Sequence, residues 1–431
     1  MSQALRYTAG DTAEPFGAKP RFDLSILRGF NASDSQYPNG LHLIRIFGAP
    51  TYELYGRKRI EVLRAPVSKD PQLSPAGSPF ALTKIGNADD LRELDAGYPD
   101  TDNRDRKMLN QGVGCKRGPD NGRQFRQGVC CQEFDWDYVA VPWGIWYTKI
   151  ENLTIEQTGI HGQDEIARNS WRATFASRHD WSRQTRDVLT KFLRVGNAND
   201  AYQRDEATTG RVGLSYVFNS GVAPYISYSA SFEPEIGTDW VGSIFGPTAS
   251  KQWEADEECR PPAFDALFTD AVYYTRPSNV ACTIDGFPEQ VGEVHSKGVE
   301  LEAIAELSEG WDMLAACYTH ACQKGEAVEG LRMSNTPYNA PSLWPNDDFG
   351  NGYRAVDCLR YIGERYGDLN ILLKVDAVTL GDLAARYTHG TFEASVNLFG
   401  ITEEEYIASY GSFGCHYAEV REVQAWLTYK W

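Results

Sequence analysis

Alternation of apolar and polar residues dominates the C-terminal two thirds of the chain. In the last stretch Val423, Ala425, Leu427, Tyr429 and Trp431 are separated by mostly polar residues. Successive side chains of a β-strand point to opposite faces, so this period of two predicts a strand with one apolar and one polar face. The pattern alone is compatible with a membrane barrel and with a soluble sandwich.

Pairs of such stretches separated by turn residues predict β-hairpins. Residues 211–218 and 222–232 flank Asn219-Ser220-Gly221, and residues 299–307 and 311–319 flank Ser308-Glu309-Gly310. The same pattern recurs at 355–363, 377–388 and 391–399, and less clearly at 124–140 and 171–185. We expect about 14 to 16 strands in all. Short turns alternate with long polar stretches such as 233–252 and 323–341, which is typical of an up-and-down barrel, although a sandwich or propeller is also possible.

Composition narrows the class of protein. The 431 residues carry a formal charge of −17, so a nucleic-acid partner is not expected. No run approaches the roughly 18 apolar residues that a membrane-spanning helix needs, which excludes helical membrane proteins but not membrane β-barrels. Aromatic residues make up 12% of the chain, and they suit both strands and the girdles of membrane barrels.

The N-terminal third has a different character. Residues 1–69 contain short mixed strands and turns, whereas residues 70–122 are rich in Asp, Arg, Gly and Pro and show no period. We therefore expect an irregular linker or loop at 70–122. The first residues lack a basic region followed by an apolar one, so no signal peptide is expected within this chain.

The sequence contains no constellation that predicts an enzyme or a metal site. Glu300, Glu302 and Glu306 share one strand face, but their spacing favours a solvated wall over a glycosidase acid/base pair. No GxSxG, Walker A or HExxH motif occurs, and the nine cysteines lack zinc-ligand spacing. We predict no catalytic residues, no protein-bound metal and no cofactor.

Several blocks of sequence resemble one family. RFDLSILRGF at 21–30 and RIEVLRAP at 59–66 are similar to the plug domain of TonB-dependent outer-membrane receptors. Further blocks at 208–234, 292–303 and 406–431 are similar to barrel segments of the same family, closest to its ferrichrome-type siderophore receptors.

This resemblance implies an all-β protein with a transmembrane antiparallel β-barrel and a partial N-terminal plug. The expected domains are a plug at 1–69, a linker at 70–122 and a barrel at 123–431. The implied function is binding of a ferric siderophore in the outer membrane, in contact with its lipid, and import with energy supplied by the TonB complex. The siderophore would be the transported ligand and not a cofactor. The short box through which the family contacts TonB is not found in this chain.

The resemblance also implies roles for individual residues. Arg28 is expected to hold the plug through strand carbonyls or barrel carboxylates, with ligand contact as the alternative, and Gly29 is expected at a tight backbone position. The plug motif comprises Arg28, Gly29, Arg59, Glu61 and Arg64. Phe16, Phe47 and Tyr52 fall where the family presents ligand-contacting aromatic residues, with ordinary loop packing as the alternative. Tyr225 lies on the polar face of its strand and is a further candidate for ligand contact, with a plain wall position as the alternative.

Some features depart from the family pattern. The barrel region is too short for the roughly 22 strands of plugged transporters. Asp256, Glu257 and Glu258 interrupt a strand whose family counterpart is apolar on one face, and Cys415 lacks its usual disulfide partner. The sequence therefore leaves open a truncated barrel that does not transport, or a soluble β-rich binding protein.

Overall fold

The structure is a computed structural model of the 431-residue chain. It describes residues 5–13, 25–31, 57–63, 78–83, 91–101, 104–105, 108–114, 147–192, 195–198, 201–235, 238–239, 243–263, 265–284, 287–324, 332–367, 373–411, 414–418 and 420–430. Within these residues no helix is both long enough and apolar enough to cross a membrane.

The described residues form β-strands joined by turns and loops. The N-terminal strands are β1 (Asp11–Ala13), β2 (Ser25–Leu27), β3 (Phe30–Asn31), β4 (Arg57–Leu63), β5 (Ser78–Thr83), β6 (Leu91–Thr101), β7 (Arg104–Asp105) and β8 (Met108–Gly114). The next are β9 (Tyr147–Arg168), β10 (Trp171–Phe192), β11 (Val195–Ala198), β12 (Ala201–Tyr216), β13 (Val222–Glu233), β14 (Thr248–Cys259), β15 (Ala266–Ile284), β16 (Phe287–Ser308) and β17 (Trp311–Lys324). The last are β18 (Ser342–Gly350), β19 (Tyr353–Ile362), β20 (Arg365–Tyr366), β21 (Lys374–Val375), β22 (Val378–His389), β23 (Phe392–Phe399), β24 (Ile407–Gly411), β25 (Gly414–Tyr417) and β26 (Glu422–Lys430).

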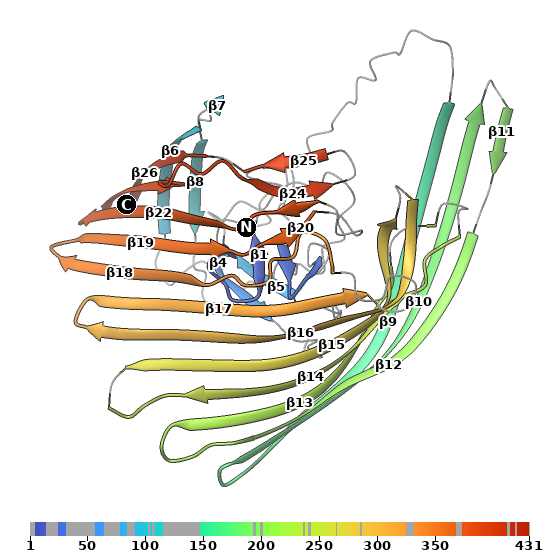
Figure 1. Ribbon diagram of the computed structural model, residues 1–431, viewed down its shortest axis with the longest axis horizontal. Coiled ribbons are helices and arrows are strands. Elements are labelled where there is room, and N and C mark those ends of the chain that lie inside the picture. Colours follow the sequence, from blue (N-terminus) through green and yellow to red (C-terminus); the bar gives the residue numbers. More distant parts are fainter. Residues whose placement is uncertain are drawn as a thin grey trace.

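One large sheet of antiparallel strands forms a barrel (Figure 1). From β12 to β19 each strand pairs with the next along the chain, and β22, β23 and β26 continue the order. The C-terminal strand β26 then pairs with β6, with Thr428 opposite Asp95. Among the described residues the barrel sheet comprises seventeen strands, of which β7 and β11 are short.

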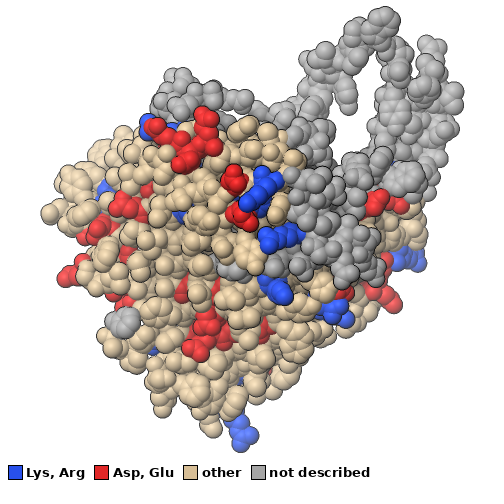
Figure 2. All heavy atoms as spheres, in the orientation of Figure 1, with Lys and Arg blue, Asp and Glu red and all other residues tan. Residues whose placement is uncertain are grey.

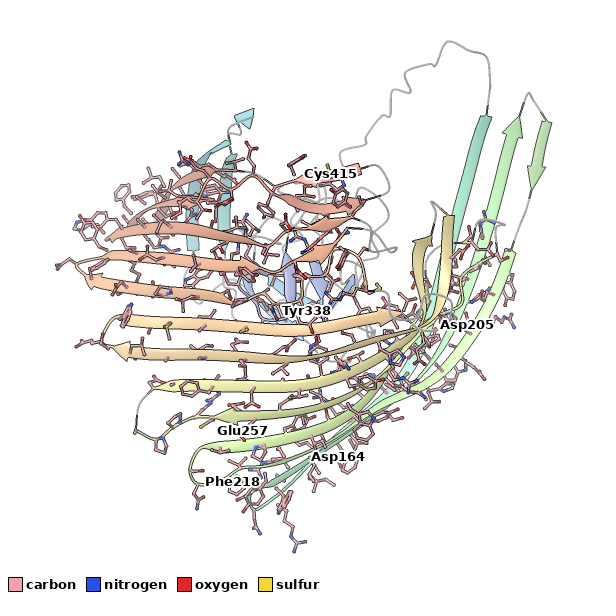
Figure 3. All side chains as sticks on the ribbon, in the orientation of Figure 1. Asp164, Asp205, Phe218, Glu257, Tyr338 and Cys415 are labelled. Carbon is pink, nitrogen blue, oxygen red and sulfur yellow. The ribbon has the colours of Figure 1, made fainter. Side chains whose placement is uncertain are left out.

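The two ends of the barrel differ in their connections. Tight turns at one end join β9 to β10, β16 to β17, β18 to β19 and β22 to β23. The connections at the other end include the long segments 234–247, 325–341, 363–377 and 400–421. Phe218 lies at the short-turn end, whereas Tyr338 and Cys415 lie toward the long-loop end (Figure 3). The sequence predicts this alternation of short turns and long loops, which is typical of an up-and-down barrel.

Burial along the wall is opposite to that of a soluble sandwich. On β13 to β16 the buried side chains are mainly polar, and they include Ser229, Gln252, Thr275, Ser296 and Glu300. Their neighbours on the outer face are large, apolar and about half exposed, and they include Ile226, Trp253, Val272 and Leu301. Uncharged residues form most of the face shown in Figure 2. An apolar exterior around a polar interior is the pattern of a barrel that faces lipid.

The plug segments, which we define as residues 5–13 and 25–31, lie against the inner wall of the barrel (Figure 1). They form the three-stranded sheet β1-β2-β3, and a separate hairpin pairs β4 with β5. Leu27 and Phe30 of the plug pack with Val294 of β16 in a small apolar cluster. The plug is therefore fastened to the wall by a limited apolar contact, and polar contacts supply the rest.

Most of the predicted hairpins are confirmed. Residues of β12 pair with β13 around the turn at Gly221, and β16 pairs with β17 around Gly310. On the final strand Leu427 and Tyr429 face outward while Glu422 and Thr428 are buried. Trp431 and the stretch 124–140 lie outside the described residues.

Two expectations are corrected. The region 70–122 is not wholly irregular, because it contains β5, β6, β7 and β8, and β6 and β8 belong to the barrel sheet. The domain boundaries themselves stay predictions. Asp256 to Glu258 do not interrupt the wall, because β14 continues to Cys259 with its pairing to β13 intact. Asp256 follows Gln252 and Glu254 on the inner face, and Glu257 lies near the end of the strand.

Candidate functional site

A tight turn presents Arg28 to the barrel wall. Leu27 of β2 pairs with Phe30 of β3, so Arg28 and Gly29 form a two-residue hairpin loop. Both residues have positive φ, 50° and 87°, as a type I′ turn requires. Glycine adopts this conformation without strain, whereas arginine does not. The turn is also tied to the first plug segment, because the Arg28 amide donates to the Gly10 carbonyl at 2.8 Å.

The Arg28 guanidinium is paired with two wall carboxylates. Its Nε and Nη2 donate to the two oxygens of Glu300 at 2.8 Å each, and Nη2 also donates to Glu254 Oε1 at 2.8 Å. The group lies 4.0 Å from the centre of the Tyr273 ring. These three wall residues come from the adjacent strands β16, β14 and β15. We call this set of contacts the Arg28 contact.

The electrostatics of the Arg28 contact keep the arginine charged. The side chain of Arg28 is 2% exposed, and burial alone would lower its pKa. The charge and hydrogen bonds of Glu300, with the charge of Glu254, outweigh burial and raise the pKa of Arg28 above its ordinary value. Buried charges are tolerated only with such pairing, so the contact holds the plug only when both partners are present.

Two further contacts fix the backbone of the turn. Ser296 Oγ of β16 donates to the Arg28 carbonyl at 2.9 Å. Gly10 has a φ of 78°, and a Cβ atom at this position would lie 2.5 Å from Glu300 Oε1. A residue with a side chain would therefore both strain the backbone and displace the carboxylate that binds Arg28.

A second contact joins the start of the plug to strands β18, β22 and β23. The Tyr7 hydroxyl donates to Asp382 Oδ2 of β22, and Arg6 Nη1 lies 3.7 Å from the same oxygen. The Tyr7 ring packs edge-on against Trp344 of β18, with ring centroids 4.6 Å apart, and the Arg6 guanidinium lies over the Phe399 ring of β23. Burial, and then the Asp382 charge, raise the pKa of Tyr7, so its hydroxyl stays protonated. We call this the Tyr7 contact.

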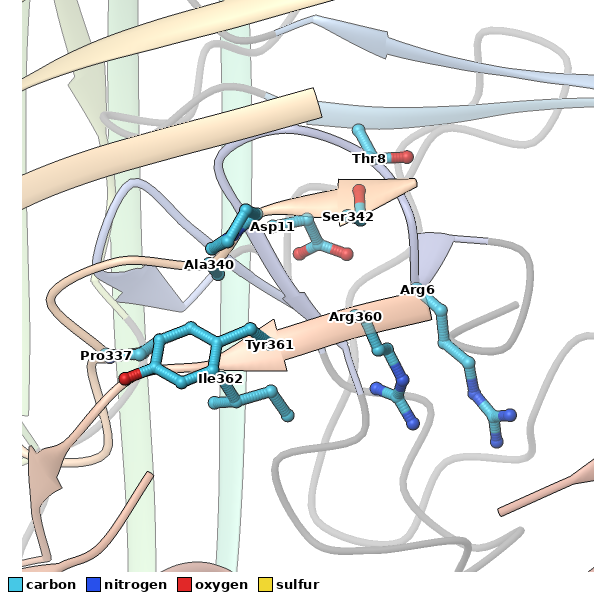
Figure 4. Close-up of a pocket in the computed structure, with 10 residues that line it drawn as sticks. Arg6, Thr8, Asp11, Pro337, Ala340, Ser342, Arg360, Tyr361 and Ile362 are labelled. Atoms are coloured by element: carbon cyan, nitrogen blue, oxygen red, sulfur yellow. The ribbon is translucent and has the colours of Figure 1, made fainter. Parts of the chain in front are cut away.

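A small cavity with both polar and apolar lining lies beside the Tyr7 contact. Its volume is about 30 Å³, and its lining includes Arg6, Thr8, Asp11, Ser342 and Arg360 (Figure 4). A cavity of this size with several polar partners has room for one or two waters. The Tyr7 contact therefore lies beside a space that water can enter.

No group of three or more His, Cys, Asp or Glu side chains in the described residues is arranged to hold a metal ion. The Arg28 contact and the Tyr7 contact hold the plug segments against the barrel wall by hydrogen bonds and charge.

Comparison with known proteins identifies the family. A family model described as "TonB dependent receptor-like, beta-barrel" matches residues 69–400. The chain belongs to the TonB-dependent receptor family. It is 30% identical over 307 residues to the ferrioxamine receptor of Yersinia enterocolitica, covering 68% of this chain and 42% of that protein.

Other relatives agree with this placement. The ferrichrome outer membrane transporter/phage receptor of Escherichia coli K12 is 31% identical over 292 residues, covering 64% of this chain and 38% of that protein. The chain thus spans about two fifths of the length of these curated relatives. The crystal structure of the ferric yersiniabactin uptake receptor from Yersinia pestis superposes with a TM-score of 0.77 at 12% identity, covering 100% of this chain and 95% of that one. At this identity the likeness shows a shared fold.

The residues predicted from the family motif have different outcomes. The structure brings Arg28 to barrel carboxylates, which are one of its two expected kinds of partner, and Gly29 takes the positive φ of the turn. Arg59 and Glu61 lie on β4, opposite Leu82 and Phe80 of β5. Arg64 lies outside the described residues, as do the three aromatic candidates Phe16, Phe47 and Tyr52.

Tyr225 lies near the short-turn end of β13. Its hydroxyl accepts a hydrogen bond from Arg211 Nη2 of β12 at 2.8 Å. Its ring covers Gly213, where a Cβ atom would collide with the Tyr225 hydroxyl. These contacts fit the wall position that the sequence left as an alternative, and ligand contact by Tyr225 stays a prediction.

Sequence reasoning misplaces or misses several residues of the two contacts. The strand pattern puts Glu300 on a solvated wall, but the residue is 2% exposed because Arg28 covers it. Glu254, Tyr273, Tyr7 and Asp382 do not stand out in the sequence. A charged residue on the inner face of a strand, such as Asp382 among VTLGDLAARY, is the available signal, but it does not name a partner.

Proposed function

We propose that this receptor binds a ferric siderophore in the outer membrane and imports it with energy supplied through TonB. The observation that carries the proposal is the inverted burial of the wall. An apolar exterior suits lipid, and a polar interior occupied by an arginine-anchored plug suits a gated passage for a hydrophilic solute. Membership of the TonB-dependent receptor family supports the same function.

The proposed ligand class is a ferric hydroxamate. The two relatives described above are named for ferrioxamine and ferrichrome. In such a chelate the oxygens of the siderophore fill the coordination sphere of iron, so the receptor needs to recognise only the shape and charge of the complex. We propose that Phe16, Phe47 and Tyr52 supply aromatic contacts to it, because aromatic faces suit a bulky and partly apolar ligand.

The test is iron uptake by cells that lack their own siderophore receptors and express this chain. Binding and uptake of ⁵⁵Fe-loaded ferrioxamine B and ferrichrome are measured with and without an uncoupler. We expect saturable binding that persists with the uncoupler and uptake that the uncoupler abolishes. Phe47→Ala should weaken binding, and Phe218→Ala is the matched control, because Phe218 is about half exposed at the short-turn end of the barrel. Absence of saturable binding at any ligand concentration would refute the proposal.

A barrel that does not transport is the second candidate. It is favoured by the seventeen strands of the described barrel sheet, fewer than the roughly 22 of plugged transporters. In the same experiment this candidate predicts binding without any uptake that depends on energy.

A further inference from the structure

Asp382 has a different partner on each of its two carboxylate oxygens. Oδ2 accepts from the Tyr7 hydroxyl of the plug, and Oδ1 accepts from the Gly400 amide at 2.8 Å. The residue is 3% exposed, so water does not readily replace either partner. Because the two oxygens belong to one planar group, a rotation that follows one partner moves the other oxygen as well.

Gly400 is the first residue of the long segment 400–421 between β23 and β26. Its φ is 65°, and a Cβ atom there would collide with the carbonyl oxygen of Val420 at the other end of the segment. The next amide, of Ile401, donates to the Gly381 carbonyl of β22 at 2.9 Å. The segment is therefore closed tightly at its base, where Asp382 binds it.

The outer part of this segment is joined to two neighbouring loops. The Asn335 side chain donates to the Tyr410 carbonyl and accepts from the Tyr410 amide, each at 2.8 Å. Arg365 Nη2 donates to the carbonyls of Ile407 at 2.5 Å and Ala408 at 3.2 Å. Gly367 lies against the Tyr410 ring, where a side chain would not fit. We call residues 332–341, 363–367 and 400–411 together the loop unit.

We propose that Asp382 is the positioning residue that couples the plug to the loop unit of this receptor. The coupling runs from the first plug segment through Tyr7 to Asp382, and from Asp382 through Gly400 to the base of the loop unit. It requires no ligand, so it holds or fails independently of the proposed function. Coupling between two sites is reciprocal, so a change in the plug should alter the stability of the loop unit, and a change in the loop unit should alter that of the plug.

The test is amide hydrogen exchange of the full-length receptor in membrane vesicles. Tyr7→Phe removes only the hydroxyl bound by Asp382, and Tyr274→Phe is the matched control, because its hydroxyl contacts His295 on neighbouring strands of the wall. Loss of a hydrogen bond to a charged group shifts a local opening equilibrium by about tenfold or more. We therefore expect Tyr7→Phe, and not Tyr274→Phe, to raise exchange about tenfold at residues 400–411.

The reciprocal experiment starts from the loops. Asn335→Ala should raise exchange at residues 5–13 as well as at 400–411. In an Asp382→Asn background the effect of Tyr7→Phe on the loop unit should disappear. The proposal is overturned if Tyr7→Phe loosens residues 5–13 alone, or if its effect on the loop unit persists without the Asp382 carboxylate. The two single variants Tyr7→Phe and Asn335→Ala decide the matter if Asp382→Asn does not fold.

Discussion

The Arg28 contact and the Tyr7 contact hold the same plug to the same wall by different means. Arg28 is a charge held by two carboxylates and the Tyr273 ring in a site with little solvent exposure. Tyr7 is a neutral donor to one carboxylate, next to a cavity that has room for water. Removing Arg28 leaves two buried carboxylates without this cation, whereas removing the Tyr7 hydroxyl leaves one carboxylate that keeps its hydrogen bond from the Gly400 amide and its ion pair with Arg6. The first contact is thus a strong anchor and the second is the easier one to release.

Truncation of Arg28 is the largest expected effect. Arg28→Ala leaves Glu254 and Glu300 without their cation, and breaking a buried pair in this way costs about 3–5 kcal/mol. The measurement is the free energy of unfolding of the plug by urea. Arg28→Lys, which keeps the charge but not the bidentate geometry, should fall between the wild type and Arg28→Ala. A loss below about 1 kcal/mol for Arg28→Ala would show that the plug is held elsewhere.

Substitution of Asp382 should cost less. Asp382→Asn keeps the size of the side chain but weakens its hydrogen bonds to Tyr7 and Gly400, at about 1–3 kcal/mol. The same urea titration measures it. If Asp382→Asn destabilises the plug as much as Arg28→Ala does, the proposed difference between the two contacts is wrong.

Gly10 tests how closely the plug approaches the Arg28 contact. Gly10→Ala forces a positive φ on alanine and places its Cβ atom near Glu300. We therefore expect the free energy of unfolding, measured by urea titration, to fall by about 2 kcal/mol. Gly350 is the matched control, because it has a φ of 72° but a Cβ atom there would meet nothing within 4 Å. Gly350→Ala should therefore show the backbone strain alone, about 1 kcal/mol. Equal losses would mean that Glu300 moves aside at no cost.

The smallest of the expected effects is the loss of stability of the Tyr7 contact at alkaline pH. The pKa of Tyr7 is raised in the folded protein above its ordinary value of 10.0, so the folded state keeps a proton that the unfolded state loses. This stability is fully present below pH 10 and declines as the pH rises above it, by up to about 1.4 kcal/mol per pH unit. The measurement is the difference in unfolding free energy between wild type and Tyr7→Phe from pH 8 to about pH 11. A difference that does not change with pH would contradict the buried, protonated hydroxyl.

The sequence predicts the strands of the C-terminal two thirds of the chain better than those of the N-terminal third. Alternation in 211–232 and 299–319 leads directly to β12, β13, β16 and β17, because side-chain period and turn residues are local properties. The segment 91–101 alternates only briefly, at Leu94, Ala96 and Tyr98, and contains Gly97 and Pro99, yet all of it forms β6. Pairing with β26 on one side and β8 on the other supplies the order that its own residues do not.

In the Arg28 contact, the sequence predicts the plug residue but not its partners on the wall. The RGF block singles out Arg28, and its resemblance to the family names barrel carboxylates as a class of partner. Glu300 reads as a solvated wall residue because the strand pattern places it on the polar face, and nothing local shows that an arginine 272 positions away covers it.

The sequence by itself determined that the strands of this protein have one apolar and one polar face, because successive side chains of a strand point to opposite sides. The tertiary structure decided that the apolar face lies on the outside of a barrel and the polar face on the inside. Only the tertiary structure decided which polar side chains meet. Tyr7 and Asp382 are 375 positions apart, and they become partners only once strand register and the curvature of the barrel have placed one wall residue opposite one plug residue. Such long-range pairs carry no local signal, since their physical cause lies in the curvature of the whole sheet around the plug.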